Sequence, residues 1–152
     1  MDISCVYYSP VGALIIVEKE EKIVRINFSN KKNTAPKTPL LKEAVLQLKA
    51  YFSGDLQKFD LPLNPEGTPF RKAVWHQLLQ IPYGETRSYK DIANALHKPN
   101  ACRAIGGANH HNPIPIIIPC HRVIGADGSL TGYGGGMDKK QYLLLLEQQN
   151  FN

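Results

Sequence analysis

Cys120 and His121 stand side by side at the end of an apolar run, and their types and spacing suit nucleophilic chemistry. They lie in IPIIIPCHRVIGADGSLTGYGGG, residues 114–136. An ordinary thiol is only a few per cent thiolate at neutral pH, so a nucleophilic cysteine needs a base beside it, and the base needs a group that orients it. Adjacent residues of an extended strand face opposite sides, so His121 can serve Cys120 only if the chain turns after Pro119 or if a water bridges the two side chains. Cys120 could equally be a buried structural thiol, and residue types alone leave both interpretations open.

Two short helical patterns precede this segment and predict a helix-turn-helix over about residues 87–111. The patterns are TRSYKDIANAL (86–96) and NACRAIGGANHH (100–111), which are joined by HKP. Many DNA-binding proteins use such a pair, but most small helical hairpins bind nothing, so the pattern alone leaves the partner open. Gly106 and Gly107 each weaken a helix by about 1 kcal/mol relative to alanine, which we interpret as a sign that another backbone passes close to them.

The first part of the chain predicts a small lobe of strands followed by a helix. The runs SCVYYS, GALIIVEK and KIVRINF are rich in β-branched and aromatic residues and are separated by turn residues, which indicates an antiparallel meander. Apolar residues then recur at helical spacing from Leu40 to Phe52, and FDLPL is expected to return as an edge strand. NPEGTP (64–69) has the composition of a linker, so we expect domains over residues 1–67 and 68–152.

Composition and charge narrow the class of protein. The chain has 152 residues and a formal net charge of +5. Nine Lys and Arg against eight Asp and Glu leave residues 1–67 at +1, whereas nine against five leave residues 68–152 at +4, so the second part is the candidate for a polyanionic partner. Three cysteines without a CxxC pair, a start unlike a leader peptide and the lack of a long apolar stretch predict a cytoplasmic protein that does not contact a membrane.

Several motifs in this chain together resemble those of the O6-alkylguanine-DNA alkyltransferases, which move an alkyl group from a damaged base onto their own cysteine. The motifs are IPYGETRSYKDIA, ACRAIGGANHHNP, PCHRV and KKQYLLLLE, and they follow the family's order from about residue 69 to residue 147. The resemblance implies an α/β (α+β) fold. It has a small strand-rich N-terminal lobe with a ribonuclease H-like plan and a mostly helical C-terminal lobe, which carries a helix-turn-helix and an active-site cysteine at a strand end. The first lobe of this chain matches only in that gross plan.

The same resemblance implies a DNA repair mechanism in which each molecule reacts once and no cofactor takes part. Cys120 would accept the alkyl group from O6-alkylguanine, and also from O4-alkylthymine, in duplex DNA. His121 would take the thiol proton through a water, and Glu147 would orient His121. From its own position alone, Glu147 would be a solvated residue at a helix end. Asn112 resembles the family's hinge between the recognition helix and the active-site segment.

The resemblance also implies how the damaged base is reached. A base inside a duplex hides its O6 atom, so the nucleotide must leave the stack and the gap must be filled. Tyr89 resembles the tyrosine that helps to rotate the nucleotide outward and that donates a proton toward the ring nitrogen of the leaving guanine. Arg103 resembles the arginine that enters the gap.

The implied base pocket and DNA surface involve further residues. The residues implied to line the pocket are Pro115, Val123, Tyr133 and Gly134. The backbone N–H of Gly134 would reach the guanine oxygen, and the carbonyls of Cys120 and Val123 would accept hydrogen bonds from the exocyclic amine. The second helix of a monomeric protein would enter the minor groove, which carries little sequence information. The small residues expected at that contact are Ala101, Ala104 and Gly107.

Two other functions fit parts of the pattern. A thiol hydrolase could use Cys120, His121 and Glu147, but it would turn over and would need an oxyanion hole. A non-catalytic module that binds alkylated DNA has the acceptor cysteine replaced, whereas this chain retains it. A zinc site at Cys5 would need further ligands that the first lobe does not offer in its sequence, so we predict no metal. Arg122 is expected to form an ion pair in the core rather than to contact phosphate.

Overall fold

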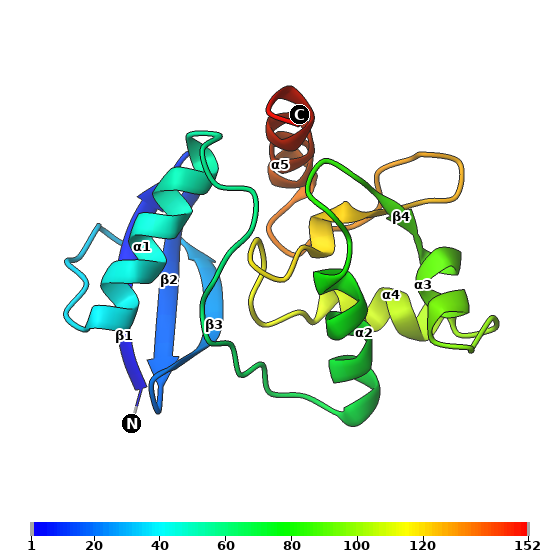
Figure 1. Cartoon of the computed structure of the whole chain (residues 1–152), viewed down its shortest axis with the longest axis horizontal. Coiled ribbons are helices and arrows are strands. Elements are labelled where there is room, and N and C mark those ends of the chain that lie inside the picture. The colour runs from blue at the N-terminus through cyan, green and yellow to red at the C-terminus, as the bar shows by residue number, and fades with distance from the viewer. Residues whose placement is uncertain (1, 152) are drawn as a thin grey trace. The chain divides into compact units, whose positions relative to one another are not determined.

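The structure is a computed structural model that describes residues 2–151 and divides into two compact units (Figure 1). The first unit ends at Glu66 and the second begins at Gly67, inside the NPEGTP segment. Prolines and glycine in that segment disfavour both helix and strand. Each unit has fully buried apolar residues of its own, such as Leu14 in the first and Leu143 in the second.

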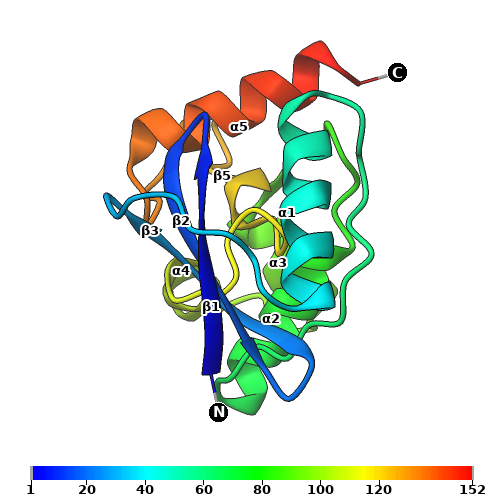
Figure 2. The ribbon, with the colours of Figure 1, turned by 90° about the vertical axis from the view of Figure 1, so that its left-hand side faces the viewer.

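The first unit is a three-stranded antiparallel sheet with a helix packed against it (Figure 2). Its strands are β1 (Asp2–Ser9), β2 (Gly12–Lys19) and β3 (Lys22–Ser29), in the order β1-β2-β3. Helix α1 (Pro39–Phe52) begins after Thr38, whose hydroxyl oxygen accepts a hydrogen bond from the Leu41 N–H at 3.1 Å. The meander and the helix predicted from the residue pattern are confirmed.

The edge strand expected at FDLPL is wrong. Leu63 forms a single parallel bridge with Ile23. The Ile23 N–H donates to the Pro62 carbonyl at 2.9 Å, and the Asn64 N–H donates to the Ile23 carbonyl at 2.9 Å. Pro62 has no N–H to contribute to a ladder, so the pairing stays limited to this point.

The second unit is mostly helical. Its helices are α2 (Pro69–Leu79), α3 (Tyr89–Ala95), α4 (Cys102–His110) and α5 (Met137–Gln149). The predicted helix pair is confirmed as α3 and α4. Trp75 of α2 is buried, and its indole N–H donates to the Ala108 carbonyl of α4 at 2.8 Å, which fixes α4 on α2. Across residues 2–151, every helix is too short or too polar to cross a bilayer.

A short parallel pair of strands joins the start of α3 to the segment that follows Cys120. The strands are β4 (Arg87–Ser88) and β5 (Val123–Ile124), and Arg87 faces Val123 in their register. Figure 1 shows β4 leading directly into α3. Because Tyr89 directly follows Ser88, which faces Ile124 in the register, the start of α3 is anchored beside β5.

The apolar run before Cys120 folds as a buried turn and not as the expected strand. Pro115 and Ile118 form an isolated bridge, and Ile116 has a φ of 75°. Prolines interrupt this run, and a residue without an N–H cannot sustain a strand ladder. Cys120 is therefore the first residue of a short 3-10 helix, η1 (Cys120–Arg122), which supplies the turn that His121 needs. The fold class, with a strand-rich first lobe and a helical second lobe, is confirmed.

The close backbone expected beside Gly106 and Gly107 is also wrong. A Cβ atom built on Gly106 would lie 3.9 Å from the Tyr89 ring, which is an ordinary contact. A Cβ atom on Gly107 would meet no heavy atom of the described residues within 4 Å. The two glycines therefore leave part of the α4 surface without side chains.

Candidate active site

Cys120 lies almost fully buried at the start of η1, with 4% of its surface exposed. Burial raises the pKa of its thiol to about 11, although the Asn112 side chain, the Lys140 charge and the Tyr133 hydroxyl each act to lower it. At neutral pH the residue is therefore a protonated thiol. A reaction at its sulfur requires a base that removes this proton as the new bond forms.

His121 has the protonation state and tautomer that such a base requires. Its Nε2 lies 2.6 Å from Glu147 Oε2. Burial favours a raised pKa for Glu147, but the hydrogen bonds and charges of His121 and Arg122 outweigh it and hold that pKa well below its ordinary value. An ionised carboxylate only accepts hydrogen bonds, so Nε2 carries the hydrogen and Nδ1 is the basic nitrogen. Nδ1 has no hydrogen-bond partner among residues 2–151, and burial lowers the pKa of His121, which keeps the ring neutral.

Arg122 holds Glu147 from a second side. Its Nε donates to Glu147 Oε1 at 2.7 Å, its Nη2 donates to Oε2 at 3.0 Å, and its Nη1 donates to the Ile81 carbonyl at 2.7 Å. The Gly84 N–H adds a longer hydrogen bond to Oε1 at 3.3 Å. Both charged side chains are buried, so this two-point pair fixes the carboxylate rigidly. The prediction that Arg122 forms an ion pair in the core is confirmed.

Asn112 connects the end of α4 to the turn that precedes Cys120. Its Nδ2 donates to the Ile118 carbonyl at 2.8 Å, and its Oδ1 accepts from the Ile114 N–H at 3.0 Å. One side chain therefore satisfies backbone groups at both ends of the turn. The Asn112 side chain also acts to lower the pKa of the Cys120 thiol.

Lys140 of α5 is fully buried in this site, and the sequence reasoning missed it. Its Nζ donates to the Val123 carbonyl at 2.7 Å and to both the carbonyl and the hydroxyl of Thr131 at 3.3 Å. Burial lowers the pKa of Lys140, and the negative charge of an ionised Cys120 would act in the opposite direction. A signal for this placement was present, because Lys140 precedes Glu147 by two helical turns and therefore lies on the same face of the helix.

Two tyrosines approach the site from different elements. The Tyr89 hydroxyl, at the start of α3, hydrogen-bonds with the Thr131 hydroxyl. Tyr133 is buried, and its hydroxyl acts to lower the pKa of the Cys120 thiol. Burial, followed by the negative charge of Cys120, raises the pKa of Tyr133 well above its ordinary value. Its phenol therefore keeps its proton at neutral pH.

The two backbone carbonyls expected to read a guanine already have side-chain donors. Lys140 donates to the Val123 carbonyl, and Asn109 Nδ2 donates to the Cys120 carbonyl at 3.3 Å. The Cys120 carbonyl also accepts from the Val123 N–H that closes η1, so both of its lone pairs are engaged, and a guanine amine would have to share or displace one of these donors. Asn109 is buried on α4 and was not among the expected site residues.

The residues expected to contact DNA lie on the α4 surface. Arg103 and Ala104 are exposed, and Ala101 and Gly107 are half-buried. Gly134, in the loop between β5 and α5, is exposed. The structure thus brings the predicted residues into two sets, a buried group around Cys120 and an accessible surface formed by the start and middle of α4.

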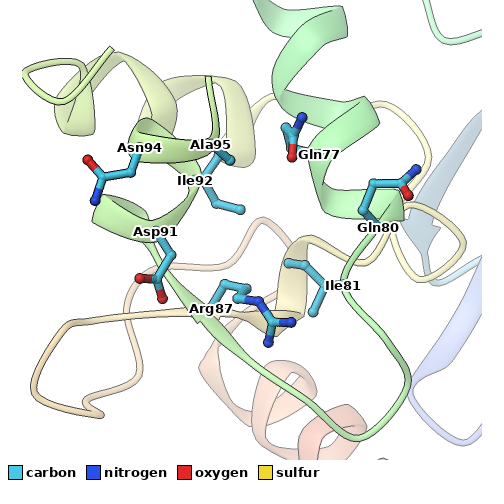
Figure 3. A pocket seen from close by; sticks show the side chains of 8 residues that line it. All are labelled: Gln77, Gln80, Ile81, Arg87, Asp91, Ile92, Asn94 and Ala95. Atoms are coloured by element: carbon cyan, nitrogen blue, oxygen red, sulfur yellow. The ribbon is translucent and has the colours of Figure 1, made fainter. Parts of the chain in front are cut away.

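A hollow of about 500 Å³ opens between α2, α3 and β4 (Figure 3). Its lining residues are Gln77, Gln80, Ile81, Arg87, Asp91, Ile92, Asn94 and Ala95. Its charged groups are already engaged, because Arg87 Nη1 lies 3.1 Å from Glu85 Oε1 and the Asp91 carboxylate accepts from the Ser88 N–H. Within residues 2–151, no group of three or more His, Cys, Asp and Glu side chains is placed to hold a metal ion.

Both units match one family of known proteins. Residues 69–149 match the DNA binding domain of 6-O-methylguanine DNA methyltransferase, and residues 4–65 match its ribonuclease-like domain. The methylated-DNA–protein-cysteine methyltransferase of Methanosarcina barkeri is 51% identical over 149 residues, which cover 93% of this chain and 94% of that protein. The constitutive methylated-DNA–protein-cysteine methyltransferase of Bacillus subtilis is 47% identical over 154 residues, which cover 94% of this chain and 93% of that protein.

Solved structures agree with these matches. The crystal structure of the Mycobacterium tuberculosis O6-methylguanine methyltransferase superimposes with a TM-score of 0.90 at 44% identity, and the match covers 100% of this chain and 96% of that one. The crystal structure of OGT from the same organism in complex with DNA has a TM-score of 0.88 at 47% identity, and the match covers 95% of this chain and 92% of that one.

Proposed function

Because this chain belongs to the 6-O-methylguanine DNA methyltransferase family, we propose that Cys120 is the residue that accepts the methyl group. The chain is a DNA repair protein, a methylated-DNA–protein-cysteine methyltransferase. The observation that carries the assignment of Cys120 is its relay: a buried thiol is followed directly by a neutral imidazole, which is hydrogen-bonded to the ionised Glu147. Cys5 is buried as well, but burial alone accounts for its raised pKa of about 11.

The chemistry is a single displacement at carbon. The Cys120 sulfur attacks the methyl carbon on O6, and His121 Nδ1 takes the thiol proton through a water. The S–C bond forms as the C–O bond breaks, and the electron pair of the broken bond stays on the guanine. Glu147 stabilises the imidazolium that results, and Arg122 keeps Glu147 in place. Water does not hydrolyse a thioether at neutral pH, so each molecule reacts once, and O4-alkylthymine would react in the same way.

Access to the base follows from the α4 surface. Extruding a nucleotide costs a few kcal/mol. Arg103 is exposed on α4 and can stack in the gap that the extruded nucleotide leaves. The small residues Ala104 and Gly107 make this face of the helix narrow enough to enter the minor groove. The relay and the α4 surface both belong to one unit of one chain, which supports action as a monomer. Three free cysteines support a reducing, cytoplasmic location.

Guanine recognition uses groups that surround the relay. The Val123 carbonyl accepts from the exocyclic amine, and the Cys120 carbonyl does so by sharing or releasing its Asn109 donor. The Gly134 N–H donates to the guanine oxygen. Tyr89 donates to the ring nitrogen on which negative charge develops. These hydrogen bonds select guanine and stabilise it as a leaving group.

The proposal is tested by the fate of the methyl group. We expect a duplex with one O6-methylguanine to add the mass of one CH₂ group to the protein, and the added mass to lie on the peptide that contains Cys120. Repaired base should rise in proportion to protein and then stop. Cys5 and Cys102 are internal controls, because non-specific alkylation would mark any accessible thiol.

Two variants distinguish the residue that accepts the methyl group from the residue that activates the thiol. Cys120→Ser should keep the fold and transfer nothing, whereas His121→Ala should slow transfer without changing its one-to-one endpoint. Repeated turnover would identify a thiol hydrolase, and an unmodified Cys120 after binding of the damaged duplex would identify a binding module. Either result would overturn the proposal.

A further inference from the structure

Lys140, Thr131 and Tyr89 form a chain of side chains that leads from the buried core to the residue assigned to the leaving guanine. Lys140 Nζ donates to the Thr131 hydroxyl at 3.3 Å, and the Thr131 hydroxyl is hydrogen-bonded to the Tyr89 hydroxyl. Lys140 is fully buried, and Thr131 and Tyr89 are each half-buried. The chemistry described so far gives Thr131 no role, and Lys140 enters it only through the effect of its charge on the pKa of the Cys120 thiol.

The direction of these hydrogen bonds follows from the groups involved. A lysine ammonium has three hydrogens and accepts none, and its three contacts here are the Val123 carbonyl, the Thr131 carbonyl and the Thr131 hydroxyl. The Thr131 oxygen therefore accepts from Lys140. A hydroxyl that accepts from a cation becomes a stronger donor and a weaker acceptor, because hydrogen bonds in series polarise one another. Thr131 is thus set to donate its own hydrogen to the Tyr89 oxygen.

We propose that Thr131 and Lys140 are positioning residues that turn the Tyr89 hydroxyl hydrogen toward the leaving guanine. The proposal rests on the proposed methyl transfer and deepens it. If Thr131 donates to the Tyr89 oxygen, the single hydrogen of Tyr89 is left for the guanine ring nitrogen. Without the Thr131 hydroxyl, Tyr89 loses this preset orientation and must find it as the reaction proceeds.

Charge and protons balance in this scheme. As the S–C bond forms and the C–O bond breaks, one proton moves from Cys120 to His121 and one moves from Tyr89 to the guanine. Guanine leaves neutral, His121 becomes an imidazolium and Tyr89 becomes a phenolate. The phenolate keeps the hydrogen bond from Thr131 next to the Lys140 charge. Afterwards the His121 imidazolium releases its extra proton to solvent and the Tyr89 phenolate takes one up.

Backbone pairing and the Lys140 hydrogen bonds fix the positions of these three residues relative to one another. β4 ends directly before Tyr89, and its partner strand β5 begins at Val123, whose carbonyl accepts from Lys140 at 2.7 Å. Lys140 therefore fastens both β5 and the loop that carries Thr131. A structural role for Lys140 and an orienting role for Thr131 coexist, so the test must separate them.

The test uses Thr131→Val, which keeps the shape of the side chain and removes the hydroxyl, with Thr131→Ser as the matched control that retains it. Single-turnover methyl transfer is measured at saturating protein on two duplexes. One contains O6-methylguanine, and the other contains its 3-deaza analogue, in which a C–H group replaces the ring nitrogen. We expect Thr131→Val to slow transfer from O6-methylguanine by about tenfold, the loss of one hydrogen bond, and to leave the rate on the 3-deaza duplex unchanged. Thr131→Ser should match the parent on both duplexes.

The outcomes are distinct. Equal rates for Thr131→Val and the parent on O6-methylguanine would overturn the orienting role. Equal slowing on both duplexes would show that Thr131 acts only through the shape of its loop, which also overturns it. Failure of the parent protein to methylate Cys120 from O6-methylguanine would instead refute the proposed function itself.

Discussion

Glu147→Gln should lower the stability of the second unit far more than a typical surface substitution. The Glu147 carboxylate accepts hydrogen bonds from His121 at 2.6 Å, from Arg122 at 2.7 and 3.0 Å, and from Gly84 at 3.3 Å. Glutamine offers one oxygen, and its NH₂ group would face donors. Arg122 would also remain as a buried charge without a counterion. Breaking one partner of a buried ion pair costs about 3–5 kcal/mol, and we expect a loss in that range.

The assay follows from the position of Trp75, the single tryptophan of the chain. It is buried in the second unit, so its fluorescence during urea unfolding reports the stability of that unit. Glu85→Gln is the matched control in the same unit, since Glu85 forms a partly exposed pair with Arg87 at 3.1 Å. Exposed pairs contribute about 0–1 kcal/mol, so the control should change the free energy of unfolding by no more than that.

Combining Arg122→Met with Glu147→Gln tests the cause. If the uncompensated arginine dominates the loss, the double variant should be more stable than Glu147→Gln alone. A loss below about 1 kcal/mol for Glu147→Gln would refute the reasoning. A double variant that is less stable than the single one would show that the lost hydrogen bonds, and not the stranded charge, account for the effect.

Two further predictions concern pH and DNA. Because burial lowers the pKa of His121, methyl transfer should keep its rate as pH falls from about 8 to about 6.5, the ordinary histidine pKa, and decline only below it. The free energy of unfolding should decline in the same acidic range, because His121 binds a proton there in the unfolded chain but not in the folded one. A transfer rate that halves above pH 7 would contradict the lowered pKa of His121. Arg103→Ala should leave thermal unfolding nearly unchanged, because the side chain is exposed, yet slow transfer from duplex DNA by about tenfold, the value of one stacking contact. Transfer from a single-stranded oligonucleotide, where no gap needs filling, should be unaffected, and equal slowing on both substrates would exclude the gap-filling role.

Local residue patterns predicted the elements whose formation depends on their own sequence. The three strands of the first unit are rich in β-branched and aromatic residues and are separated by turn residues, so they were predictable. Helix α1 was predictable because it follows apolar spacing from Leu41 onward. The turn before Cys120 was not. Its isoleucines favour a strand, and only the prolines within the run and the two hydrogen bonds of the Asn112 side chain impose the turn.

Residues buried by distant partners were the hardest to predict. Lys140 has a side chain that is rarely found in a core, and it is buried because the Val123 and Thr131 oxygens accept its hydrogens. Glu147 would have been assigned to solvent on helix position alone, and only the family resemblance indicated its role. Its actual environment depends on His121 and Arg122, whose approach no pattern within α5 encodes.

The burial of Cys120 also gives the protein chemical selectivity. A thiol with a pKa of about 11 is ionised in only about one molecule in ten thousand at pH 7, whereas an ordinary cysteine is ionised to a few per cent. Dissolved oxidants and electrophiles react with the thiolate, so burial protects the Cys120 thiol from reagents other than the methylated base. For a protein that can react only once, this latency preserves the thiol until a methylated base is held against it.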